Sequence, residues 1–343
     1  MELRNLGNSG TMVSELALGT MTFGAEADEP TSHALLDHFL EGGGTLVDTA
    51  DVYSSGVSES IIGRWLARNH GRRDEIVLAT KGRFPMGAGP NDLGLSRTHL
   101  RRALDGSLRR LGVDHIDLYQ LHAWDGLTPL EETLRFLDDA VSAGKISYYG
   151  FSNYLGWQLT KAARIAAEHG WSPPVTLQPQ YNLLVRGIEH EIVPAALDAG
   201  LGLLPWSPLA GGWLSGKYRR DESPTGATRL GENPTRGMEA WDARNADPRT
   251  WEVVDALAAV ADELGATSAQ VALRWLADRP GVTSVILGAR TVDQLDDTLR
   301  TADVRLPDDL RRRLDDASAP RAEVYPYGEQ AVAQRHRKRE GGR

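Results

Sequence analysis

A phenol, an ammonium, a carboxylate and an imidazole in this chain could together deliver a proton to a carbonyl oxygen. Tyr53 carries the phenol, but a tyrosine with its usual pKa of about 10 is a poor proton donor at neutral pH. A nearby ammonium lowers that pKa, and a carboxylate can hold the ammonium in place. Asp48 precedes Tyr53 in the same stretch, and Lys81 and His122 each follow a short apolar run. These four residues are the candidate catalytic residues.

Each of the four, taken singly, also has an ordinary structural interpretation. Asp48 could cap a loop or a helix, and Tyr53 could be a half-buried aromatic residue. Lys81 could be a solvated strand end, and His122 could be a structural histidine. The catalytic interpretation therefore depends on whether the fold brings the four side chains to one place.

The chain alternates short apolar segments with amphipathic helices, several of which end at a glycine. A small hairpin is expected from residues 3–6 and 11–13, which flank the turn Asn8-Ser9-Gly10. Buried strands are expected at residues 14–19, 45–47, 76–80, 116–121, 146–150, 175–178, 202–206 and 284–287. Helices are expected at residues 31–41, 58–69, 96–111, 129–142, 155–169, 189–199, 250–264, 268–277 and 292–301. Residues 210–249 form the longest irregular stretch.

This order predicts an α/β fold, a (β/α)8 TIM barrel with an N-terminal β-hairpin. A doubly wound open sheet is the alternative, but it usually has a glycine-rich phosphate turn after its first strand. No G-x-G-x-x-G occurs in the sequence, and Gly42-Gly43-Gly44 ends a helix. In a barrel, the carboxyl ends of the strands share one face. Asp48, Tyr53, Lys81 and His122 should therefore meet at that face.

Composition narrows the class of protein. The chain has 343 residues, 41% hydrophobic and 25% charged, with no cysteine and a net charge of −9. Disulfides and zinc–thiolate sites are thus excluded, and the negative charge argues against a general nucleic-acid surface. No apolar run approaches the ~18 residues of a membrane span, and the N-terminus does not resemble a signal peptide. We expect a cytoplasmic protein that binds no metal, and the oligomeric state is not predicted.

The domain organisation follows from the same pattern. Residues 1–320 are expected to be a single catalytic domain, and residues 321–343 a C-terminal tail. The basic run at 335–339 within that tail is interpreted either as a disordered terminus or as a segment that contacts a partner or the active-site rim.

Taken together, the motifs resemble the aldo-keto reductase superfamily, over essentially the whole chain to about residue 320. The opening segment 4–10, the stretch 48–53, Lys81 and His122 resemble that family's hairpin and catalytic tetrad. Later segments that agree with the family pattern are Gly150-Phe151-Ser152-Asn153, Leu177-Gln178-Pro179-Gln180-Tyr181-Asn182, Trp206-Ser207-Pro208-Leu209-Ala210-Gly211-Gly212, Gly216-Lys217-Tyr218 and Gly288-Ala289-Arg290. The chain is similar to bacterial members that share a nicotinamide-stacking tryptophan with channel β-subunits and aryl-alcohol dehydrogenases.

The resemblance implies an NADP-dependent oxidoreductase that reduces an aldehyde or ketone with NADPH. It implies that Tyr53 donates the proton and that Lys81, paired with Asp48, lowers the pKa of Tyr53. It also implies that His122 orients the carbonyl and that Trp206 stacks on the nicotinamide. The other cofactor-binding positions that it implies are Gly19, Thr20, Met21, Asp48, Ser152, Asn153, Gln178, Ser207, Leu209, Gly211, Lys217, Gly288, Arg290, Gln294 and Asp297. Two positions depart from the pattern: Leu287, where relatives often have Pro, and Thr298, where many have Asn, so adenine recognition is left open.

The substrate is less well defined than the chemistry. Phe84, Trp124, Tyr154 and Trp213 follow strand ends and could line an aromatic pocket for a small carbonyl compound. Aryl aldehydes, ketones and keto-sugars linked to nucleotides all remain open. Two other functions were weighed: a nicotinamide-binding regulatory subunit with slow turnover, and a barrel hydrolase that uses paired carboxylates. A hydrolase function would not explain why the chain contains the segments at Ser152, Gln178 and Arg290.

Overall fold

The computed structural model describes residues 1–343 except 221, 227–228, 233–238 and 321–343, so the tail predicted at 321–343 lies outside the described residues. The strands are β1 Leu3–Asn5, β2 Met12–Ser14, β3 Leu16–Gly19, β4 Leu46–Asp48, β5 Val77–Gly82, β6 Ile116–Leu121, β7 Ile146–Ser152, β8 Thr176–Gln178, β9 Gly202–Leu203 and β10 Val285–Gly288. The helices are α1 Glu29–Glu41, α2 Val57–Arg68, α3 Arg97–Leu111, α4 Leu130–Ser142, α5 Gly156–His169, α6 Ile192–Asp198, α7 Arg229–Glu232, α8 Trp241–Asn245, α9 Pro248–Leu264, α10 Ser268–Ala277, α11 Val292–Leu299 and α12 Asp308–Ala317.

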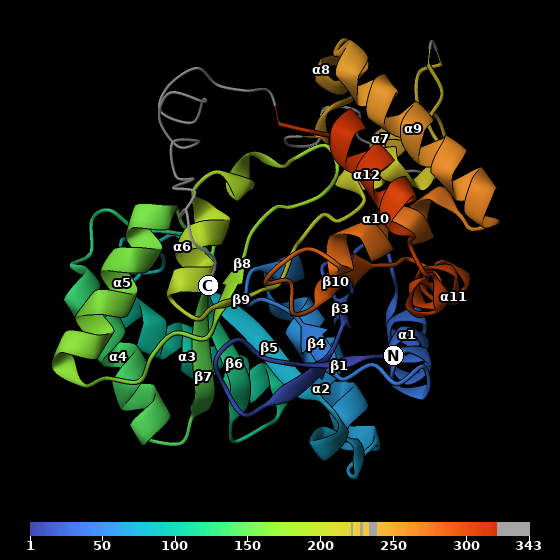
Figure 1. Ribbon diagram of the computed structural model, residues 1–343. Helices are drawn as coiled ribbons and strands as arrows, with labels where there is room; N and C mark the ends of the chain where they lie inside the picture. Colours follow the sequence, from blue (N-terminus) through green and yellow to red (C-terminus); the bar gives the residue numbers. More distant parts are fainter. Residues whose placement is uncertain (221, 227–228, 233–238, 321–343) are drawn as a thin grey trace, which may run out of the picture.

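Eight strands form one parallel sheet in the order β10-β3-β4-β5-β6-β7-β8-β9, and Figure 1 shows helices around it. The two outer strands also meet. The amide of Leu203 donates to the carbonyl of Gly281 (2.8 Å), that of Thr283 to Leu203 (2.9 Å), and that of Ile286 to Pro205 (3.0 Å). These bonds close the sheet, and the predicted (β/α)8 barrel is confirmed. No helix in the described ranges is long and apolar enough to cross a membrane.

The predicted hairpin closes the amino-terminal end of the barrel. β1 and β2 pair antiparallel, and Leu6 and Val13 beside them are fully buried. They pack against one apolar layer inside the barrel, formed by Ala17, Leu46, Ala79, Leu118, Val175, Leu204 and Ile286. The backbone is so close here that a Cβ on Gly7, which has φ of 56°, would lie 1.9 Å from the carbonyl oxygen of Val175. The apolar floor separates the hairpin from the other end of the barrel.

The structure corrects the expected element bounds in several places. Strands β4, β5 and β7 continue through Asp48, Lys81 and Ser152, because these polar side chains find partners inside the barrel. β9 is only two residues long, shorter than predicted. The stretch 210–249 contains a 3₁₀ helix at Ala210–Ser215 as well as α7 and α8. Helix α12 was not predicted at all.

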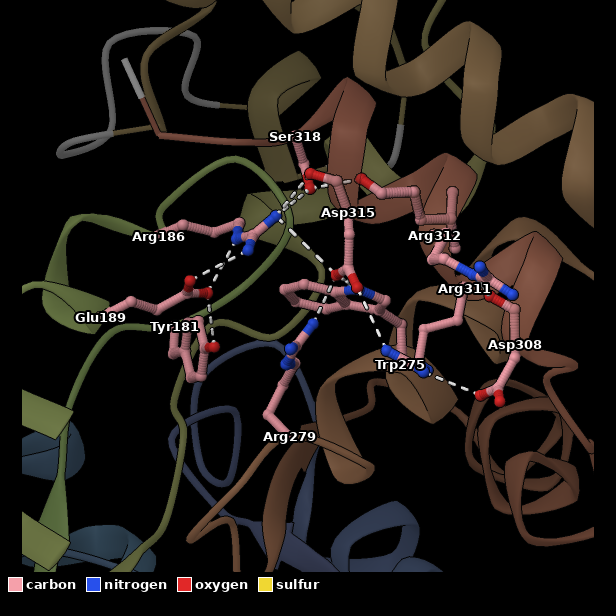
Figure 2. Close-up of polar contacts among 11 residues, drawn as sticks. Tyr181, Arg186, Glu189, Trp275, Arg279, Asp308, Arg311, Arg312, Asp315 and Ser318 are labelled. Atoms are coloured by element: carbon pink, nitrogen blue, oxygen red, sulfur yellow. Dashed lines mark hydrogen bonds and ion pairs between the residues drawn. The ribbon is translucent and has the colours of Figure 1, made fainter. Parts of the chain in front are cut away.

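Helix α12 is held by a polar network that joins it to α10, to the turn after α10 and to the loop after β8 (Figure 2). The carboxylate of Asp315 accepts hydrogen bonds from Trp275 Nε1 (2.9 Å) and from the guanidinium of Arg279. The indole of Trp275 lies between two guanidinium groups, with the Arg186 and Arg279 carbons 5.2 and 4.9 Å from the ring. Arg186 also donates to the Asp315 carbonyl (2.9 Å) and to Ser318 Oγ (2.8 Å). The network therefore fixes α12 to the loop that follows β8.

Candidate active site

Side-chain alternation along the strands places four polar residues above the apolar floor: Asp48, Lys81, Gln120 and Gln178. All four are buried, with exposed fractions of 2% or less. Lys81 Nζ donates to Asp48 Oδ2 (2.6 Å), to the Thr49 carbonyl (2.8 Å) and to the Tyr53 hydroxyl (3.3 Å). One ammonium thus links the carboxylate to the phenol, as expected for the candidate residues.

The other carboxylate oxygen of Asp48 is held by two amides. Gln120 Nε2 donates to Asp48 Oδ1 at 3.1 Å, and Gln178 Nε2 donates to the same atom at 2.9 Å. Gln178 was expected at the cofactor, whereas Gln120 was missed. The signal was present in the sequence, because Gln120 follows Leu118 with the period of two that marks one face of a strand. These hydrogen bonds fix the Asp48 carboxylate, which in turn holds the Lys81 ammonium in place.

Tyr53 begins a short 3₁₀ segment, Tyr53–Gly56, in the loop after β4. Its ring lies 5.0 Å from Lys81 Nζ and edge-on to His122, with 5.8 Å between ring centroids. Burial raises the pKa of Tyr53 above its usual value, and the Lys81 ammonium opposes that shift without reversing it. The expectation of a net lowered pKa for Tyr53 is wrong for this structure, because desolvation outweighs the nearby cation. The phenol therefore keeps its proton at neutral pH.

The pKa of Lys81 reflects the opposite balance. Burial by itself would lower it, but Asp48 and Tyr53 more than offset that cost, and the pKa lies above its usual value. A fully buried ammonium beside one carboxylate is stable only with such partners, because an unpaired buried charge is strongly destabilising. Lys81 is therefore positively charged over the whole physiological range.

His122 follows β6 directly and faces the same space. Burial, together with the Lys81 and Arg83 charges, lowers the pKa of His122 to about 2. The imidazole is therefore neutral, and a neutral imidazole still has one N–H to donate. Phe84 packs edge-on against it, with ring centroids 4.7 Å apart. The site thus offers a neutral phenol, a neutral imidazole and a buried ammonium around one space.

The opposite side of this space is formed by residues after β7 and β9. Ser152 Oγ donates to the Gln178 carbonyl (2.9 Å), and Asn153 Nδ2 donates to the His122 carbonyl (3.1 Å). Trp206, half-buried, donates through Nε1 to Asn153 Oδ1 (3.1 Å). Asn153 has φ of 58°, a conformation that asparagine tolerates better than most residues. Asn153 therefore fixes the Trp206 indole beside His122.

Comparison with known proteins places the chain in a family. Residues 15–319 match the family model described as the Aldo/keto reductase family. The chain belongs to the aldo/keto reductase family. It is 40% identical to the "Uncharacterized oxidoreductase YrpG" of Bacillus subtilis (strain 168) over 326 residues, 92% of this chain and 95% of that protein.

Two further relatives show the range of this aldo/keto reductase family. A "Probable voltage-gated potassium channel subunit beta" of Oryza sativa subsp. japonica is 38% identical, covering 89% of this chain and 92% of that protein. The "Versiconal hemiacetal acetate reductase" of Aspergillus parasiticus is 33% identical, covering 95% of this chain and 99% of that protein. The family and its named reductases support an oxidoreductase, and the family generally uses NAD(P)H.

The carboxyl end of the barrel offers several groups that could hold a nicotinamide dinucleotide. The half-buried Trp206 indole and the amides of Asn153 and Gln178 lie beside the tetrad, where a nicotinamide would have to sit. The turn that follows contains Ser207, Leu209 and Gly211, with φ of 53° at Ser207 and 65° at Gly211. The next basic side chain along this segment is Lys217, whose Nζ lies 5.2 Å from the Tyr218 ring centre. This segment could hold a pyrophosphate.

The far end of the predicted cofactor site lies after β10. Arg290 follows Gly288, and its amide donates to Gln294 Oε1 (3.0 Å). The Arg290 guanidinium pairs with Glu232 (3.1 Å) and lies 3.9 Å from Glu26. A phosphate bound to Arg290 would have to compete with these carboxylates.

Three remaining positions at this end are occupied by internal contacts. Asp297 accepts from Gln270 Nε2 (2.8 Å), so its carboxylate is tied to α10. The Thr298 hydroxyl donates to the Gln294 and Leu295 carbonyls (3.1 and 3.0 Å), and Leu287 is buried.

The predicted positions after β3 are placed beside the tetrad. Gly19 pairs with Asp48 and Gly288 on its neighbouring strands. Thr20 is fully buried and donates through Oγ1 to the Asp48 carbonyl (3.1 Å), whereas Met21 is half-buried. The amide of Thr20 also donates to the Asp48 carbonyl (3.0 Å), so both polar groups of Thr20 that can donate are occupied within the barrel. The described residues contain no cluster of three or more acidic or histidine side chains that could hold a metal.

Only part of the predicted aromatic pocket exists. Phe84 and Trp124 are both half-buried, and the Phe84 ring packs edge-on against His122. Trp213 is fully buried and stacks on Trp241 with 4.8 Å between ring centroids, so its predicted place in the pocket is wrong. It belongs to a buried aromatic cluster with Trp241 and Trp251.

The aromatic wall beside Trp124 also differs from the prediction. Tyr154 is 1% exposed and stacks on Phe151, so it supports Trp124 from below and does not line the pocket. Trp157, which was missed, is 51% exposed and packs against Trp124 at 5.4 Å. Trp157 lies at the first turn of α5, where the sequence pattern alone does not distinguish a rim residue from a surface residue.

Proposed function

We propose that this aldo/keto reductase reduces an aldehyde or ketone to the alcohol, with Tyr53 as the general acid and NADPH as the reductant. The observation that carries the proposal is the position of Lys81 Nζ, 2.6 Å from the Asp48 carboxylate and 3.3 Å from the Tyr53 hydroxyl. When bound, NADPH supplies a hydride. The protein must then supply a proton, orient the carbonyl and stabilise the charge that is left behind.

Tyr53 and Lys81 divide the acid role between them. Burial keeps the pKa of Tyr53 above its usual value, so the proton is in place before reaction. Once Tyr53 gives that proton to the carbonyl oxygen, its own oxygen becomes negative. The Lys81 ammonium already donates a hydrogen bond to this oxygen, so the developing charge is stabilised without reorganisation. Asp48 keeps the ammonium in position.

His122 positions the substrate. Because its imidazole is neutral, it can donate one hydrogen bond to the carbonyl oxygen without contributing a charge. Its ring lies edge-on to Tyr53, so both donors reach the same small space. Trp206, Asn153 and Ser152 would hold the nicotinamide on the opposite side of that space.

The proposed preference for NADPH rests on Arg290, whose planar fork suits a 2′-phosphate. The Arg290 guanidinium already lies near the carboxylates of Glu232 and Glu26. A 2′-phosphate would have to displace them, which weakens its net interaction with Arg290. We therefore place the preference for NADPH over NADH at the low end for one charged hydrogen bond, about tenfold.

The test of the acid role is the substitution Tyr53→Phe, measured as NADPH oxidation with a panel of aldehydes and ketones. Turnover should fall at least ~10²-fold, the low end for loss of a general acid. NADPH affinity, measured by fluorescence quenching, should change little. The matched control is Tyr148→Phe, which removes a phenol at the hairpin end, where Thr11 donates to it (3.2 Å). If Tyr53→Phe keeps a third of wild-type turnover, Tyr53 is not the acid.

The channel-subunit relatives favour one other role, a nicotinamide-binding regulatory subunit with slow turnover. The two roles differ in the rate of the chemical step. A single-turnover experiment with bound NADPH would decide: oxidation that stays slow for every carbonyl compound in the panel, with tight cofactor binding, favours the regulatory role. Among reductase substrates, keto-sugars linked to nucleotides belong in the same panel as aryl aldehydes.

A further inference from the structure

Arg83 is a cation at the active-site mouth that the proposed chemistry does not use. It directly follows β5, two residues after Lys81, and is half-buried. Its guanidinium lies over the Phe84 ring, with the central carbon 5.1 Å from the ring centre. One terminal nitrogen donates to the Trp124 carbonyl at 3.3 Å. The side chain therefore lies against the aromatic wall that packs on His122.

Arg83 has no acidic partner in the described part of the chain. No carboxylate among those residues lies within ion-pair distance of it, and its buried Nε has no hydrogen-bond acceptor. Arg186 and Arg274, by contrast, are paired with Glu189 (2.7 Å) and Glu15 (2.9 Å). A partly desolvated guanidinium with a single carbonyl acceptor has most of its five N–H donors left for another group.

A carboxylate near Arg83 is already occupied. Asp125, in the loop after β6, accepts hydrogen bonds from the amides of Leu127 and Leu95 (both 2.9 Å) and from Thr128 Oγ1 (2.7 Å). These contacts hold the Asp125 carboxylate between the loops that follow β5 and β6. Burial would raise the pKa of Asp125, but these hydrogen bonds and the nearby charge of Arg83 lower it. Arg83 therefore feels the Asp125 charge without forming a direct ion pair, and its remaining N–H donors are available to a ligand that enters the mouth.

We propose that Arg83 forms an anion subsite, so that the natural substrate is a carbonyl compound with a carboxylate at its far end. This inference rests on the proposed function, because the carbonyl is placed by Tyr53 and His122. Phe84 links the two groups: its ring centroid lies 4.7 Å from that of His122 and 5.1 Å from the central carbon of the Arg83 guanidinium. A substrate that spans one aromatic ring between its carbonyl and its carboxylate matches this arrangement. Arg can bind such a carboxylate through two parallel hydrogen bonds.

The experiment compares two aldehydes that differ only in charge, 4-carboxybenzaldehyde and 4-methylbenzaldehyde. The measured quantity is the ratio of their kcat/KM values in wild type, Arg83→Gln and Arg83→Lys. The glutamine keeps an N–H donor for the Trp124 carbonyl but removes the charge. The ratio should fall by about tenfold in Arg83→Gln, the low end for a charged hydrogen bond. It should fall less in Arg83→Lys, which keeps the charge without the fork.

Two controls make the outcomes distinct. Arg164→Gln removes a distant, exposed arginine of α5 and should leave the ratio at its wild-type value. Binding of the product, 4-(hydroxymethyl)benzoate, is followed by tryptophan fluorescence and compared with that of 4-methylbenzyl alcohol. This readout should show the same loss in Arg83→Gln, and added salt should weaken only the carboxylate ligand. A third aldehyde, 4-phosphonooxybenzaldehyde, tests whether the subsite prefers a phosphate. If Arg83→Gln lowers kcat/KM more for this aldehyde than for 4-carboxybenzaldehyde, the ligand of Arg83 is a phosphate and the carboxylate assignment is wrong.

Failure of this inference and failure of the proposed function look different. If 4-methylbenzaldehyde is reduced and the ratio is the same in wild type and Arg83→Gln, the subsite is wrong and the reductase stands. Equal losses for both aldehydes would show that Arg83 only positions Trp124. If neither aldehyde is reduced but product binding still depends on Arg83, the subsite stands and the proposed chemistry fails.

Discussion

Asp51 offers a sharp test of how burial controls this site. It lies between Asp48 and Tyr53, is fully buried, and neither carboxylate oxygen accepts a hydrogen bond in the described structure. Burial, followed by the nearby Glu59 carboxylate, raises the pKa of Asp51 to about 7, and Arg110 opposes this shift. Asp51 should therefore be a neutral acid in the folded protein over much of the acidic range. The change to examine is Asp51→Asn, because an amide has the size and shape of the neutral acid.

The magnitude follows from the two pKa values of Asp51. In the unfolded chain its pKa is near 3.8, and in the folded protein it is about 7. Between these values the folded state binds more protons, so wild-type stability falls as pH rises. A difference of about three pKa units corresponds to about 4 kcal/mol at 1.36 kcal/mol per unit. This contribution is complete below about pH 4 and lost above about pH 7, and Asn does not titrate.

The assay is urea unfolding of wild type and Asp51→Asn at several pH values between about 4.5 and 8. The variant should gain stability relative to wild type as pH rises, by up to about 4 kcal/mol across the range. Asp74→Asn removes an exposed carboxylate and is the control, with a stability difference that stays nearly constant. A constant difference for Asp51→Asn as well would show that Asp51 is ionised in the fold and would refute the burial argument.

Other substitutions test the remaining roles. Lys81→Met should abolish most turnover at neutral pH. Because it leaves Asp48 without its counter-ion, it should also lower the unfolding free energy by about 3–5 kcal/mol. An unchanged pH–rate profile in kinetic assays would exclude a role for Lys81 in proton transfer. Because the pKa of His122 is about 2, no histidine ionisation should shape the pH–rate profile between about pH 5 and 8. The variant His122→Asn should have a lower kcat/KM with the same pH dependence. Trp206→Ala should weaken NADPH binding in calorimetry by at least ~0.5–1.5 kcal/mol, and unchanged binding would make Trp206 structural. Arg290→Ala should weaken NADPH and leave NADH almost untouched; equal losses for both cofactors in titrations would show a structural role.

Local sequence patterns were sufficient for the barrel but not for everything packed on it. The βα units each have their own apolar period, and several of their helices end at a glycine. Helix α10 was predicted at the residues where it is found, 268–277. Helix α12 has many charged residues and few apolar ones, and its position depends on Trp275 and Arg186, far away in the sequence. Such contacts cannot be inferred from the helix itself.

The candidate site shows the same limit at the level of single residues. Spacing after strands was enough to bring Asp48, Tyr53, Lys81 and His122 together. It could not tell that Trp213 turns into the core, because that depends on Trp241 in a segment without a clear pattern.

The protonation states of the site residues could not be predicted from the sequence, because they depend on how deeply each side chain is buried. The apolar floor and the packed loops remove water from one small volume, and each titratable group there takes the state that its partners allow. Lys81 stays charged because Asp48 faces it. Burial keeps Tyr53 neutral despite that ammonium, whereas burial and the ammonium together keep His122 neutral. This combination is what a proton donor for a carbonyl requires: a phenol that holds its proton before reaction, beside a cation that stabilises the phenolate afterwards. In the proposed reaction, the proton would leave Tyr53 as negative charge forms on the carbonyl oxygen within its reach.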